Sequence, residues 1–234
     1  MNKLLRSLRN RYRKLFQVRS VTISGIQINC APGHIPDSVR HALYKDIYED
    51  TERVLIAKVV KPGMKVLEIG TGIGFISLLA TRLAGDGNVV SFEANPELEP
   101  IIRDNFARNN RVPNLVMNAV TVDGQPISFF RSDNIISSSL YDRKRQDEKI
   151  TVQSTALADI LEQHDPNVLI MDVEGAEIDL LGAGSLKSIQ HIIVEVHPHI
   201  VGDEKIALLL KSLEERGFMI KERIRKTAYL VRPA

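Results

Sequence analysis

The sequence lacks several features that define large classes of protein. Its 234 residues include one cysteine, Cys30, and no tryptophan. A single cysteine cannot form an intrachain disulfide framework, and it cannot by itself supply a Cys-only zinc site or an iron–sulfur cluster. No apolar run approaches the ~18 residues that a membrane-spanning helix needs, and the N-terminus lacks the apolar core of a secretory signal. These absences predict a protein of the reducing cytoplasm.

Acidic residues are missing from the first 19 positions, where seven basic side chains stand. Without these seven, the net charge of +2 becomes −5, so the rest of the chain is mildly acidic. It has no broad basic face, and we therefore expect no nucleic-acid partner. At helical periodicity the apolar side chains of this segment share one arc, which comprises Leu4, Leu5, Leu8, Tyr12, Leu15 and Phe16.

Residues 1–19 are thus expected to form a basic amphipathic helix. Docking of its leucines on the body of the protein or on a second subunit is the commoner fate of such a helix, and we favour it here. The alternative is weak, reversible contact with an anionic membrane surface, which would make the protein peripheral at a membrane. The oligomeric state does not follow from the sequence.

The remaining chain divides into residues 20–63 and residues 64–234. The first part is expected to contain a β segment, Val21–Asn29, and one helix from about Asp37 to Val60. In the second part strands alternate with helices. The expected strands are Lys65–Ile69, Val89–Phe92, Leu115–Val120, Val168–Met171, Ile192–Val196, Phe218–Ile224 and Ala228–Val231. The expected helices are Phe75–Leu83, Pro96–Asn109 and Glu204–Arg216.

This alternation predicts an α/β fold with a doubly wound, mostly parallel seven-stranded sheet of Rossmann-like type. The polar segment 131–149 is expected to be a mobile loop. In such sheets ligands bind beyond the carboxyl ends of the strands, so the residues that follow each strand are the candidate site residues.

A glycine-rich turn follows the first of these strands and comprises Gly70, Thr71, Gly72 and Gly74. Glycines let the backbone pass close beneath a ligand, and the next helix presents free N–H groups. The dinucleotide pattern G-x-G-x-x-G would need glycine where Phe75 stands, which counts against an oxidoreductase that binds pyrophosphate. The carboxylate of Glu68 suits a ligand with a cationic end, such as S-adenosylmethionine (SAM).

Further candidate binding residues follow the second and third strands. Glu93 can accept both hydroxyls of a ribose, although nicotinamide cofactors use an acid at the same place. Ala94 stands beside Glu93. Asn118 and Ala119 are expected to lie near an adenine ring. Together with Glu68 and the glycine turn, these residues form the predicted cofactor site.

Ionisable residues follow the fourth and fifth strands with a spacing of two, Asp172 with Glu174 and Glu195 with His197. If they converge, His197 is the natural general base, with Asp172 as the alternative base or as the group that orients the acceptor. Glu174 is the third catalytic candidate, although acids near a helix N-terminus are also stabilised by the helix dipole alone. An alternative interpretation is an oxygen-rich metal site, whose ligands would come from Asp172, Glu174, Glu195, His197 and His199.

Four segments resemble the FkbM family of class I SAM-dependent methyltransferases. They are Tyr48–Glu49, Phe92–Pro96, Met171–Glu177 and Glu195–His197, and together they span most of the chain. The resemblance implies SAM as cofactor and O-methylation of a hydroxyl on a sugar, glycan or natural product. The chain departs from the family pattern at Gly72, where Asn is common, and at Ala158 and Ile170, where Asp and Lys are common.

Two other functions stay open. The departures at Ile170 and Ala158 leave room for a non-catalytic module that binds SAM or a glycan. A nucleotide-dependent oxidoreductase is disfavoured by Phe75 and Glu68. An amino-methyltransferase of DNA or protein is disfavoured because Asp172–Gly175 replaces the Asn/Asp-Pro-Pro-Tyr motif after the fourth strand.

Overall fold

A mixed sheet forms the centre of the molecule. The computed structural model describes residues 3–131 and 148–233, and most of the expected loop 131–149 lies outside this part. Within it, one sheet contains β3 (Val66–Ile69), β4 (Val89–Phe92), β5 (Leu115–Val116), β10 (Val168–Met171), β11 (His191–Glu195), β12 (Met219–Ile224) and β13 (Thr227–Val231). Their order is β12-β13-β11-β10-β3-β4-β5. Among these described strands, β13 alone runs opposite to the other six, which confirms the predicted fold class.

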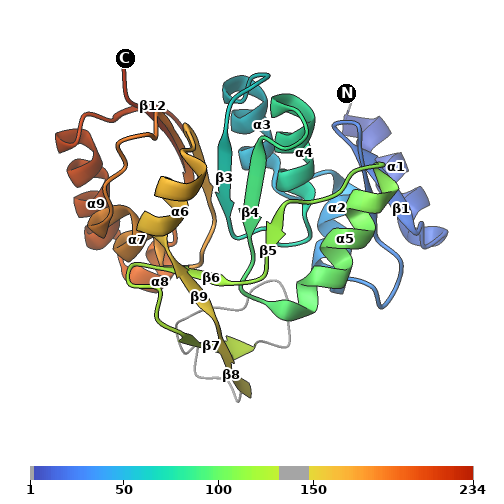
Figure 1. Ribbon diagram of the computed structural model, residues 1–234. Coiled ribbons are helices and arrows are strands. Elements are labelled where there is room, and N and C mark those ends of the chain that lie inside the picture. Colours follow the sequence, from blue (N-terminus) through green and yellow to red (C-terminus); the bar gives the residue numbers. More distant parts are fainter. Residues whose placement is uncertain (1–2, 132–147, 234) are drawn as a thin grey trace.

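Both faces of the sheet are covered by apolar side chains. Along β10, Val168 and Ile170 pack into one core, whereas Leu169 and Met171 pack into the other. The first core includes α4 (Phe75–Ala84) and α5 (Glu99–Arg108); the second includes α6 (Leu157–His164), α7 (Glu177–Ala183) and α9 (Asp203–Glu215). Figure 1 shows these two groups of helices on opposite sides of the sheet. Burial on both faces explains why the parallel strands are mostly apolar.

The expected strand Leu115–Val120 is in fact divided. Only β5 joins the main sheet, and β6 (Ala119–Thr121) pairs instead with β9 (Ser154–Ala156) beyond the sheet. The antiparallel pair of β7 (Ile127–Arg131) and β8 (Glu148–Val152) continues in the same direction (Figure 1). The chain leaves the sheet around Asn118, which therefore reaches the ligand-binding edge. Two short helices, η1 (Pro96–Leu98) and α8 (Pro198–Val201), follow β4 and β11.

The expected β segment Val21–Asn29 is a hairpin of β1 (Ser20–Ile23) and β2 (Ile26–Asn29). Ser24 and Gly25 both have positive φ, as the two central residues of a tight type I′ turn do. The hairpin is anchored on α5, where Asn105 Oδ1 accepts a 2.8 Å hydrogen bond from the backbone N–H of Asn29.

The prediction of a single helix from Asp37 to Val60 is wrong. The structure contains α2 (Asp37–Lys45) and α3 (Asp50–Val59), separated at Asp46 and Glu49, which adopt left-handed φ angles of 58° and 47°. The Asp46 carboxylate pairs with Arg9 and Arg13 of the N-terminal helix. These tertiary contacts outweigh the local helical periodicity that led to the expectation.

The N-terminal helix α1 (Lys3–Leu15) docks on α2 through arginine rather than leucine. The buried Arg13 guanidinium donates to the carbonyl oxygens of Leu43 and Tyr44, at 3.3 and 2.9 Å, and to Asp46. The opposite, apolar face points outward. Its members are exposed to between 53% and 78%: Leu5, Leu8, Tyr12, Leu15 and Phe16. The leucines of this helix whose side chains the structure describes do not dock on the body, and docking on a second subunit stays a prediction. No described helix is long and apolar enough to span a membrane.

This outward face predicts contact with an anionic membrane surface. The exposed basic residues Arg11, Lys14 and Arg19 stand beside the apolar side chains, as an amphipathic helix at a lipid headgroup layer requires. Replacing Leu8 and Leu15 with serine should reduce co-sedimentation with anionic vesicles severalfold while leaving the fold intact, because both side chains are exposed. Binding should weaken with salt, since basic residues contribute about 1 kcal/mol each at low ionic strength.

The matched control is Leu208→Ser, which removes an exposed leucine from α9. Neutral vesicles provide the second comparison. Equal sedimentation of the parent and the doubly substituted chain would contradict the prediction, and an effect of Leu208→Ser as large as that of the α1 substitutions would contradict it too.

Candidate active site

The glycine-rich turn lies directly against the end of a neighbouring strand. Gly70 has a φ of +89°, and a Cβ atom there would overlap the carbonyl oxygen of Asp172. Gly72 has a φ of +57°, in the left-handed region that Asn also adopts readily. Position 70 thus requires glycine, whereas the backbone at position 72 is compatible with either residue of the family pattern.

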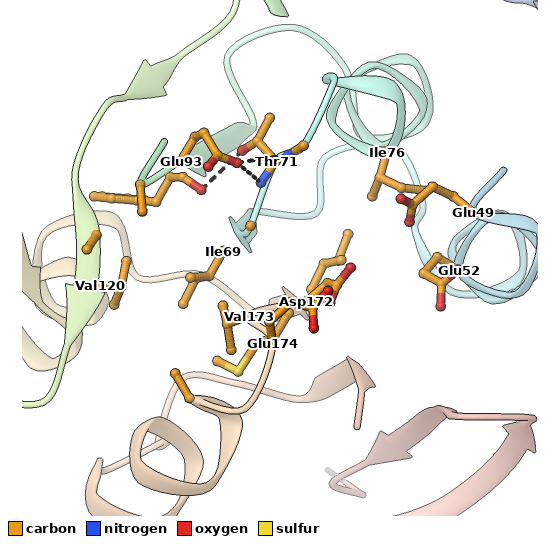
Figure 2. Close-up of a pocket in the computed structure, with 18 of the residues that line it drawn as sticks. Glu49, Glu52, Ile69, Thr71, Ile76, Glu93, Val120, Asp172, Val173 and Glu174 are labelled. Atoms are coloured by element: carbon orange, nitrogen blue, oxygen red, sulfur yellow. Dashed lines mark hydrogen bonds between the residues drawn. The ribbon is translucent and has the colours of Figure 1, made fainter. Parts of the chain in front are cut away.

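The Glu93 carboxylate fixes this turn from the adjacent strand. One of its oxygens accepts the N–H groups of Thr71 and Gly72, at 3.1 and 2.9 Å, and the other accepts the N–H of Asn95 at 2.8 Å. Burial raises the pKa of Glu93, and these backbone hydrogen bonds counteract the rise. Glu93 is therefore held in place by the backbone, with its carboxylate at the cavity wall (Figure 2).

One cavity lies over the carboxyl ends of β3, β4 and β10, and its interatomic space, open mouth included, is ≈ 1290 Å³. Nine of the predicted site residues line it: Gly70, Thr71, Gly72, Glu93, Ala94, Asn118, Ala119, Asp172 and Glu174. Glu68, Gly74 and His197 do not line it. The Asn118 amide donates to Thr155 Oγ1 at 3.1 Å, which holds this side chain at the wall.

Glu68 lies behind the glycine turn instead of facing a ligand. Its side chain is buried and accepts hydrogen bonds from the hydroxyls of Ser77 and Thr71. Its second oxygen, Oε1, is buried and has no hydrogen-bond partner in the part of the chain that the structure describes. Burial raises the pKa of Glu68 to about 7. The structure therefore places Glu68 behind the turn, where it holds Thr71, and a direct contact with a cationic ligand stays a prediction.

Three ionisable residues of the cavity lining were not among the predicted site residues: Tyr48, Glu49 and Glu52. Tyr48 and Glu49 come from the break between α2 and α3, and Glu52 from the first turn of α3. Figure 2 shows Glu49 and Glu52 on the side of the cavity opposite Glu93. Burial and the nearby Glu52 raise the pKa of Glu49 to about 8. Glu52 accepts hydrogen bonds from the hydroxyls of Thr51 and Thr227. The resemblance of Tyr48–Glu49 to the family was the available signal for this wall.

The predicted convergence of ionisable groups is present. His197 Nε2 lies 3.4 Å from Asp172 Oδ1, 3.8 Å from Glu195 Oε1 and 3.9 Å from Glu174 Oε2. His197 itself is 3% exposed and lies behind Asp172 relative to the cavity. Burial and the neighbouring Glu49 raise the pKa of Asp172 well above its ordinary value. Asp172 and Glu174 both line the cavity, and Asp172 is the one that lies closer to His197.

The cavity combines two regions of different chemistry. Near Glu93, small and apolar residues such as Ala94, Ala119 and Val120 leave room for a flat ring. At the other end, four carboxyl groups line the wall, and no Lys, Arg or His is among the described lining residues; the four are Glu49, Glu52, Asp172 and Glu174. Such a site favours a nucleoside with a positively charged substituent and disfavours phosphate.

Known proteins resemble the chain in sequence and in structure. The model of the methyltransferase FkbM domain matches residues 68–220. An uncharacterized methyltransferase of Bacillus licheniformis is 32% identical over 114 residues, which are 47% of this chain and 48% of that protein. The match thus spans about half the length of this curated relative.

A solved structure shares the fold across the whole chain. Magnesium protoporphyrin IX methyltransferase from Synechocystis PCC 6803, with bound SAM, is 13% identical and superimposes with a TM-score of 0.50. The superposition covers 99% of this chain and 96% of that one. At this level of identity the likeness extends to the fold alone.

The raised pKa of Glu68 makes a prediction about stability. A carboxyl group that is harder to ionise in the folded chain stabilises the fold below its unfolded pKa of 4.5, and this contribution is lost as the pH rises to about 7. Glu68→Gln removes the titration. The variant should therefore gain stability relative to the parent between pH 4.5 and 7.5, by up to roughly 3 kcal/mol.

Urea unfolding at several pH values measures the free energy of unfolding of the variant relative to the parent. A constant effect of the lost carboxylate is the same at every pH, so only the change of this relative stability with pH reports the titration of Glu68. Glu162→Gln, the same change on the exposed face of α6, is the control and should show a constant offset. A parallel pH dependence of the parent and Glu68→Gln would contradict the prediction.

Proposed function

Because the chain belongs to the FkbM methyltransferase family, whose cofactor is SAM, we propose that it methylates a hydroxyl group of a sugar, glycan or natural product. The observation that supports this proposal is the acidic end of the cavity. Carboxyl groups accept hydrogen bonds from the several hydroxyls of a polyol, and one of them is available as a base. The same groups would repel the phosphates of nucleic acids and of phosphorylated acceptors.

The residues of the cavity fit SAM. Glu93, fixed by the backbone of the turn, is the group that would accept the ribose hydroxyls, and Ala94 with Ala119 would border the adenine. The turn at Gly70–Gly72 lines the cavity between Glu93, where the ribose would bind, and the end that carries the four carboxyl groups. When bound, SAM supplies a methyl group on a positively charged sulfur, and its transfer to a hydroxyl oxygen releases S-adenosylhomocysteine and a proton.

Asp172 is the proposed acceptor of that proton. Its carboxyl faces the cavity, follows β10 directly, and has a pKa raised by burial and by Glu49, which makes its ionised form a stronger base. Its backbone is held against Gly70, so the base and the glycine turn keep a fixed relative position. His197, buried behind Asp172, is then a positioning residue instead of the base first expected.

The Glu93 assignment predicts a loss of cofactor affinity. Glu93→Ala removes a charged hydrogen-bond acceptor worth on the order of 1.5–3 kcal/mol, which corresponds to a roughly ten- to hundredfold weaker binding of S-adenosylhomocysteine. Calorimetric titration measures the affinity. Glu97→Ala, which removes a carboxylate just outside the lining set, is the control and should bind like the parent. Unchanged affinity in Glu93→Ala would show that the ribose lies elsewhere.

The Asp172 assignment predicts a loss of turnover. Asp172→Asn keeps the size of the side chain and removes the base, so turnover should fall about 10²–10⁴-fold while affinity for S-adenosylhomocysteine stays close to that of the parent. The assay is a mass-spectrometric screen for a +14 Da product. Matched neutral, phosphorylated and amine-bearing sugars form its three acceptor classes.

Neutral hydroxyl acceptors should be methylated, and their phosphorylated counterparts should not. Methylation confined to amines would replace the proposed O-methylation with N-methylation, which an acidic cavity also accommodates. Full turnover by Asp172→Asn would exclude Asp172 as the base.

A further inference from the structure

The imidazole of His197 is surrounded by carboxylates that lie farther from it than a good hydrogen bond requires. The residue is 3% exposed, and its Nε2 atom points toward the carboxylates of Asp172, Glu195 and Glu174. The separations of 3.4, 3.8 and 3.9 Å exceed the 2.7–3.2 Å of a good N–H···O hydrogen bond. None of the three carboxylates is therefore hydrogen-bonded to this nitrogen.

One buried atom of this cluster, Asp172 Oδ1, has no hydrogen-bond partner within the described residues. His197 Nδ1 faces the other way, toward Glu177, and does not bear on the cluster. Leaving such groups unsatisfied in the interior costs free energy, so a buried polar atom without a partner calls for a ligand or an ion. The Asp172 oxygen is the very atom that lies 3.4 Å from His197 Nε2.

The spacing of the cluster matches atoms that share one cation. One ligand atom each from Asp172, Glu195 and His197 lies within 4.8 Å of the other two. Neighbouring ligands bound at about 2.1 Å around one ion are separated by roughly 3.0–3.4 Å, because octahedral and tetrahedral angles set that distance. The 3.4 Å between His197 Nε2 and Asp172 Oδ1 falls in this range, and the 3.8 Å to Glu195 Oε1 is slightly longer.

The far side of the imidazole carries a second carboxylate. Glu177 is fully buried, and its Oε1 lies 3.4 Å from His197 Nδ1 and accepts the backbone N–H of His197 at 2.8 Å. A carboxylate on Nδ1 favours the tautomer with its proton on that nitrogen, which leaves the Nε2 lone pair directed at the cluster. Histidines that bind metals commonly have such a partner on the other ring nitrogen.

We propose that Asp172, Glu195 and His197 bind a divalent cation, with Glu174 beside them as a further oxygen ligand. One imidazole with carboxylates is a donor set that Mn²⁺ accepts, since it tolerates both nitrogen and oxygen ligands. Asp172 faces the cavity as well, so the cation would stand at the acceptor end. There it would hold an acceptor hydroxyl and make that hydroxyl easier to deprotonate.

This inference shares Asp172 with the proposed methyl transfer: with the cation bound, Asp172 would be a ligand instead of the base, so the two roles of Asp172 are alternatives. The test of the cation site does not depend on turnover. The full chain, stripped of metal by dialysis against EDTA, is titrated with Mn²⁺ alone, and free Mn²⁺ is followed by its electron paramagnetic resonance signal. One equivalent should be bound by the parent. Glu195→Gln, a change at a partly exposed side chain, should weaken binding at least about tenfold, as loss of even an outer-shell partner does.

Glu162→Gln, on the exposed face of α6, is the matched control and should bind Mn²⁺ like the parent. Thermal melting establishes that the variants are folded, and Asp172→Asn provides a second ligand variant. A parent chain that binds S-adenosylhomocysteine but no Mn²⁺ would overturn the metal site and leave the proposed function standing. Mn²⁺ binding that survives both Glu195→Gln and Asp172→Asn unchanged would also overturn it, because the ion would then lie elsewhere.

Discussion

Hydrogen bonds from backbone N–H groups to two buried carboxylates connect the loops that form the site. Glu93, after β4, accepts the N–H groups of Thr71 and Gly72 in the turn after β3. Glu177, in α7, accepts the N–H of Gly175 and that of His197 in the loop after β11. Burial alone would raise the pKa of Glu177, but the bonds from His197 and the backbone lower it. Each carboxylate thus joins two loops at the carboxyl edge of the sheet. The positions of the residues that face the ligand therefore depend on which strands are neighbours in the sheet.

The strands of the sheet were the most predictable part of the fold. β4 and β10 begin and end at the expected residues, because short apolar runs bounded by turn residues leave little choice. The helix expected across Asp46–Glu49 failed for the opposite reason. Its periodicity continues past Lys45, but the helix ends at Asp46, which has a left-handed backbone and pairs with Arg9 and Arg13, far away in the sequence. Contacts of that kind leave no local signal.

The candidate site divides in the same way. Residues that directly follow a strand, such as Gly70, Glu93 and Asp172, could be assigned because topology places every such position at one edge. The roles of Glu68 and His197 could not, since the direction of a side chain relative to the cavity depends on packing. Glu68 faces Ser77 behind the turn, and His197 faces the rear of Asp172. Glu49 reaches the wall through a left-handed backbone conformation that a glutamate adopts rarely.

The stability of the fold does not explain the carboxyl groups that line one end of the cavity. Glu49, Glu52 and Asp172 lie close together without a lysine or arginine among the described lining residues, and burial raises the pKa of Glu49 and of Asp172. Buried like charges cost folding free energy, and apolar side chains would fill the same space at lower cost. Elsewhere in the core, on both faces of the sheet, apolar side chains fill the space. A local departure from this pattern, at the one edge where ligands bind in such folds, indicates that these carboxyl groups serve binding or catalysis rather than folding.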